Sequence, residues 1–169
     1  MMEPDLILEN RNGELAFKSD KLLSAIDEQI IKTVIRFQHD YFLTGDEALM
    51  KPMILRDIAA ITKFDISTVS RAVNNMNVQT HFGVFSLKSL FSEGVQTKNN
   101  GKVSAFAVRK IMQAYLDDDE SLCDSHLTKI LQQEGYLIAR RTVSKYRHLL
   151  NIPVARLRRR EAHPKKLIS

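Results

Sequence analysis

The sequence SLCDSHLTKILQQEGYLIARRTVSKYRHLLNIP, residues 121–153, contains two helical periods separated by a glycine. Asp124 or Ser125 can cap the first helix, whose apolar residues recur at spacings of three and four. These residues are Leu127, Ile130 and Leu131. Gly135 ends this helix, and a second helix is expected to begin near Ala139 after a short turn. The stretch therefore predicts two packed helices with the connectivity of a helix-turn-helix unit.

The second of these helices is expected to separate an apolar face from a cationic one. The residues predicted to point inward are Val143, Tyr146, Leu149 and Leu150. The predicted outward arc consists of Arg140, Arg141, Ser144, Lys145, Arg147 and His148. Two adjacent arginines in a first helical turn oppose the helix dipole, at a cost of about 0.3–1 kcal/mol per charge. A bound polyanion would remove this conflict, which favours a phosphate-lined groove as the partner of this face.

An upstream stretch, LRDIAAITKFDISTVSRAVNN at residues 55–75, predicts a second pair of packed helices. Ala59 is small enough for a close crossing of the two helices. The apolar residues expected to face inward are Ile58, Ile66, Val69 and Val73. The polar outward face would present Ser67, Thr68, Ser70, Arg71 and Asn74. Arginine can bind guanine through two hydrogen bonds, while hydroxyl and amide groups can bind phosphate or base edges.

This upstream pair leaves an alternative open, because an ordinary two-helix corner with a solvated arginine has the same pattern. Many turns of this type carry glycine where Lys63 stands. If Lys63 adopts a positive φ, the conformation costs about 1 kcal/mol.

The remaining periodicity predicts a mostly α protein, since the strand signal is weak throughout. Helical patterns cover residues 21–42 and 104–116, and a Gly-, Asn- and Lys-rich stretch between the two helical pairs resembles a linker. We expect two small helical units, each containing a helix-turn-helix, joined by a flexible linker. The predicted regions are 1–50, an amino-terminal remnant; 51–93, the first unit; 94–102, the linker; and 103–169, the second unit with its basic tail.

Charge is strongly segregated along the 169 residues, although the formal net charge is only +5. Residues 51–110 hold nine basic and three acidic side chains, and residues 139–169 hold ten and one. An acidic segment lies between these blocks. Clustered Lys and Arg neutralise phosphates and release counterions, so each block is a candidate polyanion surface. Solvated charged faces without a partner are the alternative. The run at 156–160 is expected to be a flexible arm that contacts phosphate or only adds solubility.

Several other classes of function lack support in the sequence. The single Cys123 excludes an internal disulfide and a cysteine-based zinc site, and the acids at 117–120 are expected to form a solvated loop. No convergent acid, base or nucleophile indicates an enzyme, and Tyr146, which a tyrosine recombinase would need, is expected to pack. No cofactor or metal is expected. No apolar run is long enough to span a bilayer and no signal peptide is evident, so a cytoplasmic location is predicted.

The segment ARRTVSKYR at 139–147 resembles the RpoN box, the signature of the sigma-54 class of bacterial RNA polymerase sigma factors, differing from the usual form only at Ser144. Upstream segments follow in the order of that family. They are MKPMILRDIA (50–59), STVSR (67–71), VQT (78–80), GVFSLK (83–88) and LFS (90–92). The resemblance covers most of residues 40–160.

This resemblance implies that the box helix reads the GG-containing promoter element in the major groove. It assigns box contacts to Arg140, Arg141, Lys145 and Arg147, with Thr142 and Ser144 as weaker candidates. It also implies that the first helix-turn-helix lies near the GC-containing element, through Ser67, Thr68 and Arg71. Met76–Asn77 and His81–Phe82 depart from the family's usual Lys-Tyr and Pro-Arg, so two phosphate contacts near this unit are expected to be missing.

The leading hypothesis is therefore sequence-specific binding of double-stranded promoter DNA, with recruitment of core RNA polymerase for transcription initiation. The start of the chain, EPDLILENRNGEL at residues 3–15, resembles a strand-and-turn segment found late in the family's core-binding domain. The shortness of this remnant puts polymerase binding and activator response in question. One alternative is a stand-alone repressor or decoy on such promoters that does not bind core polymerase. Another is a polymerase-interaction fragment whose DNA surface is vestigial.

Overall fold

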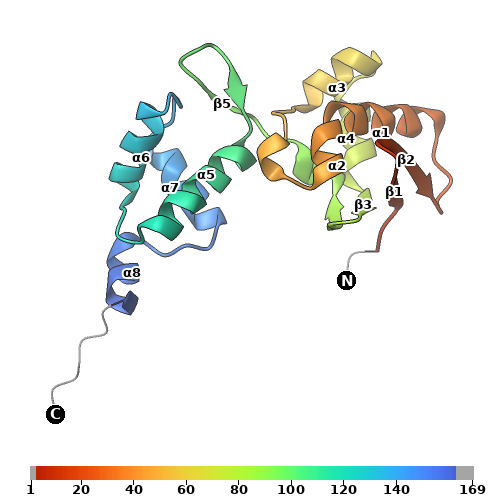
Figure 1. Ribbon diagram of the computed structural model, residues 1–169. Coiled ribbons are helices and arrows are strands. Elements are labelled where there is room, and N and C mark those ends of the chain that lie inside the picture. The colour runs from red at the N-terminus through yellow and green to blue at the C-terminus, as the bar shows by residue number, and fades with distance from the viewer. Residues whose placement is uncertain (1–2, 163–169) are drawn as a thin grey trace. The chain divides into compact units, whose positions relative to one another are not determined.

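The computed structural model describes residues 3–162 and divides the chain into two compact units, Met1–Gly94 and Val95–Ser169. The chain is mostly helical, as predicted, and the described residues also contain six short strands (Figure 1). Unit 1 comprises β1 (Leu6–Arg11), β2 (Glu14–Ser19), α1 (Ala25–Phe37), α2 (His39–Thr44), the 3-10 turn η1 (Glu47–Leu49), α3 (Leu55–Thr62), α4 (Ile66–Asn74), β3 (Asn77–Thr80), β4 (Gly83–Ser86) and η2 (Leu87–Leu90). Unit 2 comprises β5 (Val95–Gln96), β6 (Lys102–Val103), α5 (Ala105–Asp118), α6 (Asp124–Gln133), α7 (Arg140–Leu149) and α8 (Ala155–Ala162).

Four strands of unit 1 form a sheet in the order β2-β1-β3-β4. The resemblance indicated a strand and a turn within residues 3–15, where β1 lies, but the weak strand signal did not predict the sheet. Asn12 and Gly13 adopt positive φ values of 57° and 90°, as a two-residue turn between β1 and β2 requires. The chain then returns much later to pair β3 in parallel with β1, where Leu6 lies opposite Val78. Residues 1–50, expected to form a region of their own, therefore share one compact unit with residues 51–93.

The helix expected over residues 21–42 is two helices, because the backbone leaves helical geometry at Gln38. The buried Gln38 side chain donates to the Lys51 carbonyl at 2.7 Å and accepts from the Lys51 amide at 2.8 Å. These bonds attach the α1–α2 junction to the segment that enters α3. The buried side of α1 supplies Ile30, Ile31, Val34 and Ile35 to the core.

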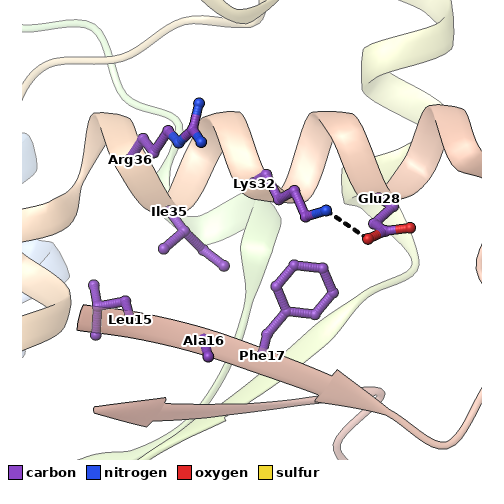
Figure 2. A pocket seen from close by; sticks show the side chains of 7 residues that line it. All are labelled: Leu15, Ala16, Phe17, Glu28, Lys32, Ile35 and Arg36. Atoms are coloured by element: carbon purple, nitrogen blue, oxygen red, sulfur yellow. Dashed lines mark hydrogen bonds and ion pairs between the residues drawn. The ribbon is translucent and has the colours of Figure 1, made fainter. Parts of the chain in front are cut away.

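A shallow groove of about 410 Å³ lies between the outer strand β2 and α1 (Figure 2). Phe17 and Ile35 point into it, and the Lys32–Glu28 ion pair, 2.6 Å, lies on its rim. β2 is an edge strand of the sheet, and the charged Glu14 and Lys18 lie on it. Charged residues on an edge strand disfavour its pairing with a strand of another chain. The two charges therefore protect the open edge of the sheet at β2.

A three-residue turn, 63–65, joins α3 to α4, and the strained residue anticipated there is present. Lys63 has a φ of 64° and donates its amide to the Ala59 carbonyl at 2.9 Å. This left-handed conformation disfavours any residue with a Cβ atom.

We expect Lys63→Gly to stabilise unit 1 by up to about 1 kcal/mol, because glycine adopts positive φ without steric cost. The free energy of unfolding from urea denaturation provides the measurement. Lys63→Ala is the control, since it removes the same charge but keeps the Cβ atom. Equal stability of the glycine and alanine variants would contradict the strain argument.

Unit 2 is built around a core shared by α5, α6 and α7. Its fully buried members are Val108, Met112, Leu127, Leu131 and Val143. Residues 94–102, expected to be a flexible linker, instead form most of the β5–β6 hairpin (95–103), whose Val95 is buried in this core. The Gly- and Asn-rich composition marks the turn of the hairpin, and Val95, with the partly buried Val103, packs the hairpin against the unit.

The basic run at 156–160 lies in α8 and is not a flexible arm. Arg158 is 7% exposed, and its guanidinium donates to the carbonyls of Glu120, Leu122 and Pro153. Arg159 donates to the Ser121 carbonyl at 2.8 Å. These bonds attach α8 to the α5–α6 loop. Residues 163–169 of the predicted basic tail lie outside the described residues.

Candidate nucleic-acid interface

Helix α7 presents one packed face and one cationic face. It begins at Arg140 after Ala139, whose side chain makes no capping hydrogen bond. Val143 is fully buried and Tyr146 is 8% exposed, so both pack as predicted. Burial raises the pKa of Tyr146, although the Arg109 charge opposes that rise. Leu149, expected to point inward, is 54% exposed because the buried stripe ends with the preceding turn.

The exposed face of α7 carries most of the residues predicted to bind DNA. Arg140, Arg141 and Lys145 are exposed, while Thr142 and Ser144 are half-buried. Within residues 3–162 no ion pair joins Arg141 or Lys145 to a carboxylate. Two guanidinium groups and an ammonium group thus remain open on one helix face, and they can donate hydrogen bonds to phosphate or to base edges.

Arg147 does not belong to this exposed face, which corrects the expectation from the sequence. It is 2% exposed and its guanidinium bridges α6 and α7. Nε donates to Asp124 Oδ1 at 2.8 Å, and Nη2 to Asp124 Oδ2 at 3.2 Å. Nη1 donates to the Ile152 carbonyl at 2.8 Å, and Nη2 also contacts Ser144 Oγ at 3.3 Å. Arg147 is therefore packed between α6 and the end of α7 and is not part of the exposed face.

The position of Arg147 follows from helix geometry, because it lies four residues after the buried Val143 and next to Tyr146. A basic residue is ordinarily assigned to solvent unless a partner is identified. The partner, Asp124, lies 23 residues earlier and was predicted only as a possible cap. An acid at the start of one helix and a base on the inward stripe of the next was the available signal.

The pKa of Asp124 is set by two opposing effects, its partial burial and its contact with Arg147. Burial raises its pKa, but the hydrogen bond and charge of Arg147, the Ser144 hydroxyl and the Arg140 charge together hold the pKa below the usual aspartate value. The carboxylate is therefore ionised at neutral pH and matches the permanently charged guanidinium. The pair is a charge-assisted, two-point contact between α6 and α7.

Helix α4 presents a smaller polar face in unit 1. Ser67, Arg71 and Asn74 are exposed, whereas Thr68 and Ser70 are half-buried. Asn74 Nδ2 donates to Ser70 Oγ at 3.1 Å, which occupies part of the hydrogen-bonding capacity of both side chains. Within the described chain no ion pair involves Arg71. The five predicted residues thus share one helix, with the Arg71 guanidinium as its open charge.

The packing of α4 differs from the prediction at one residue. Val69 and Val73 are buried as expected, and Ala72 completes the stripe. Ile66 is 46% exposed, and Ile61 at the end of α3 is 56% exposed. Ile66 lies on the surface because the buried apolar stripe of α4 begins only at Val69.

The described residues contain no cluster of three or more His, Cys, Asp or Glu side chains that could hold a metal ion. In the acidic run at 117–120, the Asp119 carboxylate accepts the Ser121 amide at 2.8 Å, which closes a local turn. Hydrogen bonding by the Ser121 side chain, and then by its amide, lowers the pKa of Asp119. Between residues 3 and 162, no helix has both the length and the apolar character needed to cross a membrane.

Comparisons with known proteins converge on one family. The family described as "Sigma-54, DNA binding domain" matches residues 19–160. The RNA polymerase sigma-54 factor of Acidithiobacillus ferridurans is 39% identical over 136 residues, which cover 78% of this chain and 28% of that protein. The corresponding factor of Escherichia coli (strain K12) is 34% identical over 148 residues, 86% of this chain and 30% of that protein. The chain therefore spans less than a third of these curated relatives.

A solved structure shares the fold. It is described as the crystal structure of Aquifex aeolicus sigmaN bound to promoter DNA. The similarity has a TM-score of 0.60 at 25% sequence identity, and it covers 94% of this chain and 60% of that chain.

Proposed function

The chain belongs to the family of sigma-54 DNA-binding domains, and from this premise we propose that it binds double-stranded promoter DNA in transcription initiation. One observation carries the proposal. α7 packs its apolar face into the core of unit 2, while Arg140, Arg141 and Lys145 remain exposed on the opposite face. An amphipathic helix with open guanidinium groups matches both the width of the major groove and the acceptors that guanine presents there.

In this proposal α7 reads the GG-containing element. Arg140 and Arg141 contact guanine O6 and N7 or the adjacent phosphates, and Lys145 binds phosphate. Thr142 and Ser144 make weaker contacts from the edge of the face, because each is half-buried. Arg147 contributes by fixing the angle between α6 and α7, so it acts as a positioning residue.

α4 contacts the GC-containing element in the same proposal, through Arg71, Ser67 and Thr68, with Ser70 and Asn74 at the edge of the face. Fewer open charges support this second contact. The α4 face has one unpaired cation, and Ser70 and Asn74 are bonded to each other. We therefore expect α7 to supply the larger share of sequence discrimination.

Core RNA polymerase is the proposed protein partner, because the relatives that match this chain are RNA polymerase sigma-54 factors. A pull-down of purified chain with core polymerase tests this assignment separately from DNA binding. DNA binding without capture of core polymerase would favour a stand-alone repressor or decoy.

A gel shift with wild-type and GG-mutated promoter duplexes tests the DNA-binding proposal. We expect each replaced base pair of the GG element to weaken binding by about 1–3 kcal/mol, roughly 5- to 150-fold. The titration should be repeated with core polymerase present and at a fixed salt concentration, because salt changes every such affinity. Equal affinity for both duplexes would contradict sequence-specific recognition.

A further inference from the structure

The β5–β6 hairpin of unit 2 is attached to the turn that leads into α7. The Leu137 amide donates to the Gln96 carbonyl at 2.7 Å, and the Lys98 amide donates to the Gly135 carbonyl at 2.9 Å. Thr97 and Tyr136 form an antiparallel bridge between these bonds. Figure 1 shows the loop of the hairpin beside the end of α6. Leu137 lies three residues before Arg140, the first residue of α7. The hairpin is therefore held next to the amino-terminal end of α7.

The pairing of the two strands determines which side chains face outward. Val95 lies opposite Val103, and Gln96 lies opposite Lys102. Because side chains alternate between the faces of a strand, the two valines share one face and Gln96 shares the other with Lys102. Val95 is buried in the core of unit 2, whereas Gln96 and Lys102 are exposed. The outer face of the hairpin is thus polar and carries a lysine.

The tip of the hairpin adds further hydrogen-bond donors in a constrained turn. Lys98, Asn99 and Asn100 are exposed. The Thr97 amide donates to the Gly101 carbonyl at 2.9 Å, and the Asn100 amide donates to the Thr97 carbonyl at 3.1 Å. Within residues 3–162 no carboxylate pairs with Lys98 or Lys102. Two ammonium groups and two carboxamides are therefore open on a turn whose backbone is already ordered.

We propose that the hairpin, residues 95–103, is a second DNA-contacting element of unit 2, in which Lys98 and Lys102 bind phosphates bordering the groove that α7 enters. This inference rests on the proposed function and extends it to a surface outside the box helix. The contact assigned to the two lysines is to the DNA backbone, because a lysine ammonium group acts as a compact point charge and phosphate contacts carry no base information. It sets the position of α7 on the duplex without adding sequence preference.

The attachment of the hairpin distinguishes this proposal from a merely solvated pair of lysines. A flexible linker would lose conformational entropy when it bound phosphate, which would offset much of the electrostatic gain. Here the bonds to Gly135 and Leu137 fix the hairpin before DNA arrives. Phosphate binding by the two lysines then costs mainly their own side-chain entropy.

Salt dependence of DNA binding tests the proposal. In the full chain carrying Lys98→Gln and Lys102→Gln, the slope of log Kobs against log salt should become shallower by about 1.8, since each phosphate contact contributes about 0.9. Affinity at about 0.1 M salt should fall about tenfold or more, by the same factor on wild-type and GG-mutated duplexes. Lys98→Arg with Lys102→Arg should retain the wild-type slope, because the charge is kept.

Lys18→Gln with Lys32→Gln is the matched control. It removes the same formal charge from unit 1, where both lysines are paired with glutamates, and should leave the slope unchanged. An unchanged slope for the hairpin variant, with a native circular dichroism spectrum, would overturn the proposal. So would a loss confined to the wild-type duplex, which would indicate base reading. Failure of the wild-type chain to discriminate the GG element would overturn the proposed function instead, and the slopes would still decide the role of the hairpin.

Discussion

Replacing Asp124 with alanine should destabilise unit 2 by up to about 3–5 kcal/mol, the cost of removing one partner from a buried ion pair, because Arg147 is buried although Asp124 is half-buried. Arg147 would keep its bonds to the Ile152 carbonyl and Ser144 but would lose both bonds to a carboxylate. Its guanidinium would then be a buried charge without a counterion. Chemical denaturation measures the loss in the free energy of unfolding. Amide hydrogen exchange in α6 and α7 then shows whether the loss is confined to unit 2.

Asp118→Ala provides the control, because Asp118 is an exposed acid of the same unit at the end of α5. Its effect should stay within about 0.5 kcal/mol. The double variant Asp124→Leu with Arg147→Met should recover much of the loss, since it leaves no unpaired charge. A cost below about 1 kcal/mol for Asp124→Ala would contradict the structural role of the pair.

The same pair makes the stability of unit 2 depend on pH in a defined direction. The pKa of Asp124 is lower in the folded chain than in an unfolded one, so the unfolded state binds a proton first as pH falls. The stabilisation is complete above the ordinary aspartate pKa of about 4 and is lost as pH falls through the folded value. The stability difference between wild type and Asp124→Ala should therefore shrink below about pH 4.

Arg141→Ala should weaken promoter binding by about 1–3 kcal/mol, roughly 5- to 150-fold, and relax the preference at one base pair. Arg141 is exposed in the first turn of α7 and has no carboxylate partner among residues 3–162, so its removal should leave the fold unchanged. Affinities for a set of duplexes with single-base replacements provide the measurement.

Arg36→Ala is the matched control, because it removes an exposed arginine of α1 in the other unit. It should leave the base preference unaltered. Equal weakening of Arg141→Ala on every duplex would reassign Arg141 to a phosphate contact. A loss of folded structure in this variant would contradict the exposed position of the side chain.

Local periodicity was sufficient to predict most helices of this chain. The helices expected over 104–116, between Asp124 and Gly135, and from about Ala139 are α5, α6 and α7, with boundaries shifted by at most two residues. The resemblance of residues 139–147 to the sigma-54 family is confirmed by the match over residues 19–160. The helix assignments and the family resemblance each depend on residues that are close together in the sequence, so they could be predicted without knowing any distant contact.

Features that depend on distant partners were not predicted. The pairing of β1 with β3 was missed because the partner residues lie about 70 positions apart, as for Leu6 and Val78. Arg147 was placed on the outer face because nothing near it in sequence indicates the Asp124 carboxylate. The basic run at 156–160 was read as an arm for the same reason, since the carbonyls that accept from Arg158 belong to a loop more than 30 residues earlier.

The position of β1 in the sheet has a consequence for how the chain is made. A ribosome releases β1 and β2 before β3, yet β1 lies inside the finished sheet and must wait for β3 to be synthesised. Parallel pairing across so long a separation is slow, because the entropy of closing the loop is lost before the contact forms. Until then the nascent hairpin exposes an unpaired strand edge, which is the place where aggregation or chaperone binding is most favoured.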